Sequence, residues 1–161
     1  MSLVALVSVN KARDKAKVSR IIQDFKTIEQ GLNLFADSKN VTSVWNCGTG
    51  CTIDGYTFGG DPTIDSMVVN TGLSTFLKSA PSGPVGGSYR YDYDGDDFCS
   101  GGCWTANAFN ILYYPSAGMA GVYGPLLDAQ IDKSDGSCGG KISWDAVNNW
   151  IAYHLSCKGS F

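Results

Sequence analysis

The chain has 161 residues, of which 43% are apolar and only 17% are charged, proportions that suit one compact domain with its own core. Twenty glycines, nineteen aromatic residues and fourteen aspartates against one glutamate point to short strands and turns rather than to a helical bundle. The net charge is −3, and beyond residue 20 there are seven basic residues against fourteen acidic ones, so we expect no nucleic-acid partner.

A single long helix is predicted at the N-terminus, from Leu3 to about Asp37. Its later part carries apolar residues every three or four positions, which is the spacing of one helix face. This stripe consists of Val18, Ile21, Ile22, Phe25, Ile28, Leu32 and Phe35. Gly31 is the weak point in the helix interior, because glycine costs about 1 kcal/mol there relative to alanine.

The first turns of this helix are apolar on all sides, so they cannot all face one small domain and need a lipid or protein partner. The segment contains Leu3, Val4, Leu6, Val7 and Val9. Its alternative interpretation is a frayed tail left by cloning. We recognise no secretory signal and no run of ~20 apolar residues. Met1-Ser2 suits an artificial start, so we expect the later part of a longer protein.

A basic cluster follows the apolar turns, and it consists of Lys11, Arg13, Lys15, Lys17 and Arg20. The rest of the chain is acidic.

The remaining pattern predicts an α+β fold in which short strands follow the helix. Helical turns are expected within 63–78 with a break at Gly72, and the alternation in GSYRYDYD predicts a strand over 87–94. AFNILYY predicts a second strand over 108–114, and Pro125 is expected in the first turn of a short helix. Residues 141–157 favour a hairpin with Asn148-Asn149 at its tip, although their apolar spacing also fits a helix.

No linker is long enough to split the chain, so we expect a single domain over 1–161. Its predicted parts are the N-terminal helix over 1–39, a helix-to-sheet loop region over 40–86, and a β-sheet and C-terminal region over 87–161.

Six cysteines predict disulfide-stapled loops in an oxidising compartment, and they are Cys47, Cys51, Cys99, Cys103, Cys138 and Cys157. Two C-x3-C pairs leave zinc open as an alternative, but zinc usually uses other spacings, and no histidine flanks these pairs. Of fifteen possible pairings we favour a disulfide between Cys138 and Cys157 that closes the hairpin, with local 47–51 and 99–103 loops.

A cluster of carboxylates in YDYDGDDF is the candidate metal site, and it comprises Asp92, Asp94, Asp96 and Asp97. Oxygen ligands on a loop suit calcium, which would relieve the repulsion between these charges. The run resembles the first half of an EF-hand loop, but position 12 is Cys103 rather than Glu. The alternative is a strand end whose acids point to water.

We find no catalytic apparatus in the sequence and expect no enzyme. His154 is the only histidine and lies in an apolar segment, which favours a structural role. The glycine-rich stretches lack both the G-x-S-x-G frame and a Walker-type lysine.

Three segments together resemble the type IV pilin-like proteins, especially the major pseudopilins of type II secretion. ALVSVNKARDKAKVSRIIQDFKTIEQGLNLFADSKN (5–40) resembles the second half of their long N-terminal helix. FLKSAPSGPVGGSYRYDYDGDD (76–97) resembles their segment of short helix and tyrosine-rich strand, and LLDAQIDKSDGSCGGKI (126–142) resembles a late stretch of some members. The family's leader peptide, processing site and early helix glutamate are absent, as we expect of a shortened chain.

The resemblance implies a long helix packed through the stripe on an antiparallel sheet, and copies that assemble through this helix into a filament. Partners would be further copies and other pilin-like subunits, at the cell surface or outside the cell. Residues 3–9 would lie in the membrane before assembly and in the filament core afterwards. The basic cluster would meet lipid headgroups or acidic loops of neighbours, and the family's calcium loop supports the aspartate cluster.

Two other functions compete with this interpretation. A secreted, disulfide-rich module could bind glycans or a surface through Trp45, Trp104, Trp144, Trp150 and the tyrosines. A small disulfide-rich hydrolase is the third candidate, and its turnover would depend on a single aspartate or histidine.

Overall fold

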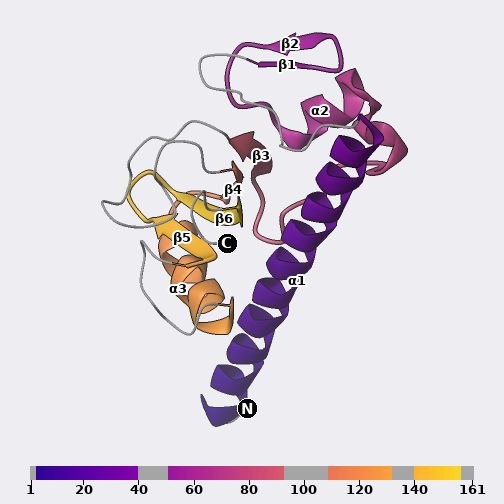
Figure 1. Cartoon of the computed structure of the whole chain (residues 1–161). Helices are drawn as coiled ribbons and strands as arrows, with labels where there is room; N and C mark the ends of the chain where they lie inside the picture. The colour runs from indigo at the N-terminus through magenta and orange to yellow at the C-terminus, as the bar shows by residue number, and fades with distance from the viewer. Residues whose placement is uncertain (1–2, 40–50, 93–108, 132–139, 157–161) are drawn as a thin grey trace.

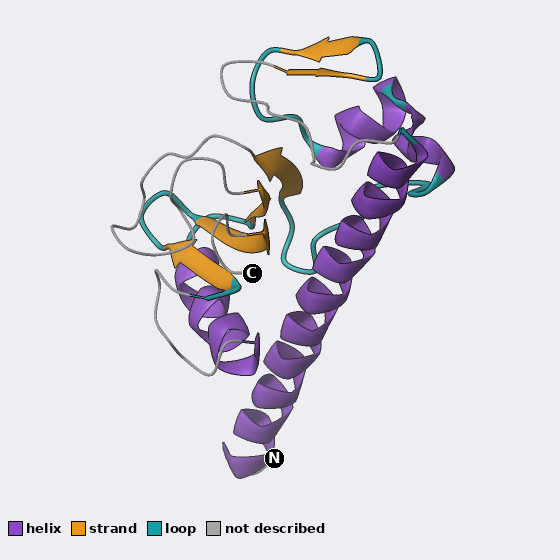
Figure 2. Cartoon of the chain, viewed as in Figure 1, coloured by secondary structure: helices purple, strands orange, loops and turns teal. Residues whose placement is uncertain are grey.

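The computed structural model describes residues 3–39, 51–92, 109–131 and 140–156, and within them the fold is α+β (Figure 1). The predicted long helix is confirmed as α1, Leu3–Ser38. Four strands form the main antiparallel sheet: β3 (Ser88–Asp92), β4 (Phe109–Tyr114), β5 (Ile142–Asp145) and β6 (Trp150–Ser156). Their order is β3-β4-β6-β5, so each strand is hydrogen-bonded to an antiparallel neighbour (Figure 2).

The region between α1 and the sheet holds a small hairpin and two short helices. Strands β1 (Cys51–Ile53) and β2 (Tyr56–Phe58) pair through a two-residue turn in which Asp54 and Gly55 both have positive φ, as a type I′ turn requires. The predicted helical turns are α2 (Ile64–Asn70) and the 3-10 helix η1 (Gly72–Thr75). Thr63 caps α2, because its hydroxyl accepts from the amide of Ser66.

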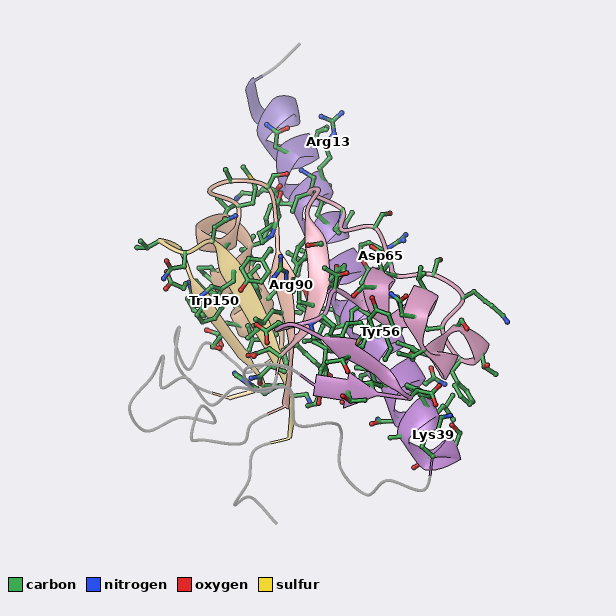
Figure 3. All side chains as sticks on the ribbon, turned by 90° about the horizontal axis from the view of Figure 1, so that it is seen from above. Arg13, Lys39, Tyr56, Asp65, Arg90 and Trp150 are labelled. Atoms are coloured by element: carbon green, nitrogen blue, oxygen red, sulfur yellow. The ribbon has the colours of Figure 1, made fainter. Side chains whose placement is uncertain are left out.

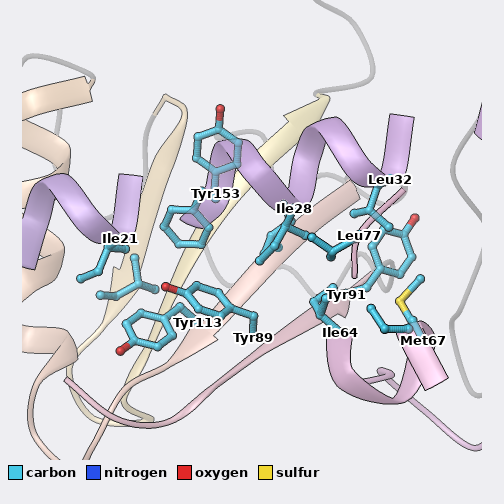
Figure 4. Close-up of a cluster of buried hydrophobic side chains, with 14 of the residues drawn as sticks. Ile21, Ile28, Leu32, Ile64, Met67, Leu77, Tyr89, Tyr91, Tyr113 and Tyr153 are labelled. Carbon is cyan, nitrogen blue, oxygen red and sulfur yellow. The ribbon is translucent and has the colours of Figure 1, made fainter. Parts of the chain in front are cut away.

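The core lies between α1, α2, α3 and one face of the main sheet (Figure 4). The stripe side chains of α1 lie in it: Ile21, Phe25, Ile28, Leu32 and Phe35 have no exposed area, Val18 is 3% exposed, and Ile22 is partly buried against them. The sheet contributes Tyr89, Tyr91, Ile111, Tyr113, Ile142, Ile151 and Tyr153. Burying each large apolar side chain stabilises the fold by about 1.5–3 kcal/mol, so this stripe holds α1 on the sheet.

The glycine in the middle of α1 is a packing position. A Cβ atom on Gly31 would lie 3.1 Å from Cβ of Leu77, which is buried on the segment after η1. The expectation that Gly31 only weakens the helix was therefore incomplete, because its missing side chain lets α1 approach Leu77.

Helix α3 (Ala120–Ile131) begins earlier than predicted and contains Pro125 in its interior. The prediction was wrong because glycines hide the apolar spacing of Ala120, Tyr123 and Leu127, which are all buried. Gly124 lies against the indole of Trp144 on β5, where an added Cβ would come within 2.3 Å of Cγ. Helix α3 can therefore lie close to β5.

The predicted C-terminal hairpin is confirmed as β5 and β6, which pair from Ile142 with Tyr153 to Asp145 with Trp150. Asn149 adopts a positive φ of 58° at the tip, and its side chain accepts from the amide of Ala120 and donates to the carbonyl of Pro115. This asparagine therefore closes the turn and also holds the start of α3.

Replacing Gly124 with alanine tests the packing of α3 on β5. We expect Gly124→Ala to lower the free energy of unfolding by about 1–3 kcal/mol, since the new methyl group overlaps the Trp144 ring. The helix preference of alanine, about 1 kcal/mol, offsets part of this loss. Equilibrium unfolding in urea, monitored by circular dichroism, measures this change in the free energy of unfolding. The control is Gly59→Ala, whose added Cβ would meet no atom within 4 Å; equal effects of the two variants would contradict the packing argument.

Candidate functional site

The N-terminal part of α1 extends beyond the head, which is the rest of the described chain (Figure 1). Every residue from 8 to 13 is exposed, and Val9 is 48% exposed. The basic residues Lys11, Arg13 and Lys15 lie on this part, and Figure 3 shows Arg13 clear of the head. Leu3, Val4, Leu6 and Val7 belong to the helix, while their side chains lie outside the description. Among the described residues, no helix is long and apolar enough to cross a membrane.

Three tyrosines of the head donate hydrogen bonds to carboxylates of α1, and we call these contacts the tyrosine clasps. Tyr123 of α3 donates to Asp14 (3.0 Å), Tyr89 of β3 to Asp24 (2.9 Å), and Tyr153 of β6 to Glu29 (2.8 Å). The three acceptors span 15 positions of one helix, so they fix both its rotation and its position along the sheet.

The middle clasp is the most deeply buried. Asp24 is 3% exposed, and its other oxygen accepts from Arg20 at 2.9 Å. Burial, together with the negative charge of Asp24, raises the pKa of Tyr89 far above its usual value, so Tyr89 stays a donor. Phe25 packs beside this clasp, with its ring edge-on to Tyr89 at 5.7 Å and stacked on Tyr153 at 5.0 Å.

The outer clasps each include a lysine. Lys141 lies 3.4 Å from Glu29 and 4.4 Å from the centre of the Tyr153 ring. Lys17 donates to the hydroxyl of Tyr123 at 3.1 Å. These two tyrosines therefore contact a cation as well as a carboxylate, and they lie on two different elements of the head.

A groove of about 340 Å³ lies between the N-terminal half of α1 and α3, and it is lined by Lys11, Asp14, Lys15, Val18, Leu126 and Gln130. Leu126 is 43% exposed and Val122, on the same helix, is 49% exposed. Lys11, Asp14 and Lys15 of α1 and Gln130 of α3 supply its polar lining, and Val18 and Leu126 supply the apolar lining. The sequence alone does not indicate this groove, because the groove depends on the position of α3.

The candidate calcium site lies mostly outside the described residues, since Asp94, Asp96 and Asp97 are not described. Asp92 ends β3, is 2% exposed and accepts from the side-chain amide of Asn110 at 3.4 Å. Within the described ranges, no group of three or more potential metal ligands comes together. Calcium therefore stays a prediction.

The predicted disulfides also lie outside the described residues. Cys47, Cys99, Cys103, Cys138 and Cys157 are not described, and Cys51 is described only as the first backbone position of β1. Their pairing stays a prediction. Of the four tryptophans, Trp150 is 5% exposed and Trp144 is partly buried, while Trp45 and Trp104 are not described.

A buried polar row crosses the sheet on the face away from α1, one residue from each strand: Asp92, Asn110, His154 and Ser143. The carboxylate of Asp92 can only accept, so the side-chain nitrogen of Asn110 faces Asp92. The side-chain oxygen of Asn110 then lies 2.7 Å from Nδ1 of His154. His154 therefore carries its proton on Nδ1, and Nε2 accepts from the hydroxyl of Ser143 at 3.0 Å.

This row has the residue types of a nucleophile, a base and an orienting amide. Ser143 has no exposed area and His154 is 2% exposed, so no substrate reaches the hydroxyl in this conformation. The row satisfies buried polar groups of four strands, which is a structural role. The sequence pattern could have indicated it, because Asp92 alternates with the tyrosines of β3 and so faces away from α1.

No protein-family model, curated protein or solved structure matches this chain.

Removing the hydroxyl of Tyr89 tests the middle clasp. We expect Tyr89→Phe to lower the free energy of unfolding by about 1.5–3 kcal/mol, because a buried carboxylate loses a hydrogen-bond donor. The control is Tyr56→Phe, which alters a ring that is 44% exposed and should change stability by less than about 0.5 kcal/mol. Urea unfolding of both variants measures the difference. An equally stable Tyr89→Phe protein would show that Asp24 does not depend on the clasp.

The buried row predicts a loss of stability in acid. Burial, and secondarily the positive charge of Lys141, lowers the pKa of His154 to about 4. Between an ordinary pKa near 6.5 and this value, the unfolded chain binds a proton that the folded chain does not, so stability falls as the pH falls. The free energy of unfolding should therefore fall by about 3 kcal/mol between pH 7 and pH 4 through this group.

His154→Gln removes this titration and supplies the comparison. Urea unfolding across the pH range should show the wild type losing about 3 kcal/mol more than the variant between pH 7 and pH 4. Parallel pH profiles would mean that His154 does not carry the effect.

Proposed function

We propose that this chain is a structural subunit of a type IV pilus or a type II secretion pseudopilus, which assembles through α1. The observation that carries the proposal is the division of one helix into two parts. Residues from about 14 onward contact the head, whereas residues 8–13 are exposed. At about 1.5 Å per residue the 36 residues of α1 span about 54 Å, more than the head needs.

The chemistry of the exposed part supports an assembly role. In the sequence, Leu3, Val4, Leu6 and Val7 precede the exposed residues 8–13, and Val9 is half exposed. Apolar residues on every side of a helix favour a partner that surrounds it, either lipid or a bundle of similar helices. Membrane anchoring before assembly and helix packing in a filament afterwards both provide such a partner.

The attachment of the head to α1 also supports this role. The buried stripe and the tyrosine clasps hold the helix at defined points, so the head and the helix behave as one rigid unit. A filament needs this property, because its subunits must present the same surfaces repeatedly. The long helix on an antiparallel sheet is the arrangement that the pilin-like resemblance implies.

The proposal includes a cell-surface or extracellular location, disulfide-stapled loops and a calcium-binding aspartate cluster. These follow from the resemblance and from the sequence, and each can fail without the filament proposal failing. The competing glycan- or surface-binding module has less support from the described tryptophans, because Trp150 is 5% exposed and Trp144 packs against α3.

The decisive experiment localises the protein in the cells that carry its gene. Antibodies against the chain should label surface filaments in immunogold electron microscopy and should detect the chain in the sheared filament fraction. Ala12→Pro, in the exposed part of α1, should reduce filaments at least about tenfold, since proline breaks a helix at a cost of about 3 kcal/mol.

Ala12→Ser is the matched control, because it changes the same exposed position and preserves the helix. Both variants should unfold in urea at the wild-type midpoint, since the contacts with the head begin beyond residue 12. Unlabelled filaments, or normal filaments from Ala12→Pro, would contradict the proposal. A binding module would instead retain its binding in both variants.

A further inference from the structure

The two halves of α1 differ in charge. Residues 10–20 contain five basic residues and one acidic residue, whereas residues 21–38 contain three acidic residues and one basic residue. Figure 1 shows the two ends far apart, with α3 beside the N-terminal half and α2 and η1 beside the C-terminal end. The cluster of basic residues and the exposed carboxylate of Asp37 therefore lie at separate places on one helix.

The basic surface includes the groove between α1 and α3. Lys11 and Lys15 are exposed along it, and Asp14 is already engaged by Tyr123. Its apolar lining comes from Val18 and Leu126, and Val18 is only 3% exposed. A ligand must therefore insert an apolar side chain and place a negative charge beside the lysines.

The C-terminal end of α1 offers this combination. Leu34 is 44% exposed and Asp37 is exposed, and a spacing of three places them on neighbouring positions of one helix face. The nearby cation Lys39 is bound to Asp54 at 2.6 Å. Within the described part of the chain, no ion pair engages Asp37.

We infer that the groove between α1 and α3 receives Leu34 and Asp37 of a second copy of this chain. Leu34 would pack on Leu126, and Asp37 would pair with Lys15 or Lys11. This inference rests on the proposed function and deepens it, because it names the surfaces through which neighbouring subunits meet. Complementary charge on two parts of one chain favours this encounter and opposes the alignment of like ends.

The geometry of the groove favours a protein over a lipid surface. A layer of headgroups would reach the exposed lysines, but the lining formed by Val18 and Leu126 lies between two helices. A single projecting side chain from a helix fits that shape. An anionic membrane is accordingly the competing outcome of the test.

Contact between two different surfaces is heterologous, so each copy keeps one surface available for the next copy. The step from Lys15 to Asp37 is 22 positions of α1, or about 33 Å at 1.5 Å per residue. Copies in parallel orientation would therefore be displaced by about 33 Å along the helix axis.

A charge exchange tests the contact. Lys15→Glu and Asp37→Lys should each reduce filaments about tenfold, because each places like charges together. The double variant should restore them, since it re-forms the pair with opposite signs. Lys26→Glu is the matched control, an exposed lysine of α1 outside the groove, and it should leave filaments unchanged. Normal filaments from the single variants, or no recovery in the double variant, would overturn the inference.

Carbodiimide cross-linking tests the same contact without filaments. The reagent joins a lysine amine to a carboxylate in direct contact. In an equal mixture of ¹⁵N-labelled and unlabelled chains at high concentration, a peptide pair with one labelled and one unlabelled member can only come from contact between two copies. We expect mixed-isotope peptides joining Lys11 or Lys15 to Asp37. In the double variant Lys15→Glu/Asp37→Lys the link between positions 15 and 37 should persist with the amine and the carboxylate exchanged, whereas the link from Lys11 should be lost. If these peptides form but the protein makes no filaments, the contact between copies is supported and the proposed function is not.

The absence of these peptides would overturn the contact even if filaments form. Co-sedimentation with vesicles of anionic phospholipid separates the competing partner. If Lys15→Glu weakens binding to these vesicles, Asp37→Lys does not, and no mixed-isotope peptide forms, the basic surface binds lipid. This outcome would overturn the inference.

Discussion

The attachment of α1 to the sheet is the constraint on which the rest of the structure depends. The buried stripe supplies most of the adhesion, but apolar contact is not directional. The tyrosine clasps supply the direction, because each hydroxyl meets a carboxylate at one position of the helix. A shift of one residue would rotate the helix by about 100° and separate the stripe from the sheet and the carboxylates from their donors.

Both faces of the main sheet carry buried side chains, and the two faces differ in chemistry. The face toward α1 is aromatic and aliphatic, whereas the other face carries the row of Asp92, Asn110, His154 and Ser143 beside a small apolar cluster of Leu112, Trp150 and Ala152. A slip of any strand by one residue would turn its member of the row to the wrong face and leave buried polar groups without partners. The row therefore specifies strand register more sharply than an apolar face of the same size.

Local patterns in the sequence predicted most of the elements, because α1, β3 and the C-terminal hairpin each have a strong period of their own. The start of α3 was missed because Gly121 and Gly124 interrupt its apolar spacing, and these glycines let α3 approach Ala146, which follows β5, and Trp144 of β5. The clasps were missed for a different reason. Their partners are separated by 65 to 124 positions, so no local pattern connects a tyrosine with its carboxylate. The same limit concealed the groove.

The position of the clasps along α1 has a mechanical consequence. Tyr123 contacts Asp14 and Lys17 of α1 beside the point where the helix leaves the head, and Tyr153 holds Glu29, fifteen positions beyond Asp14. Two separated anchors resist tilting of a rod, whereas a single apolar patch would let it pivot. The exposed part of α1 therefore keeps a defined direction relative to the head. In a filament built on this helix, a load applied to the head would pass into the helix along the sheet, where the clasps and the stripe bear it together.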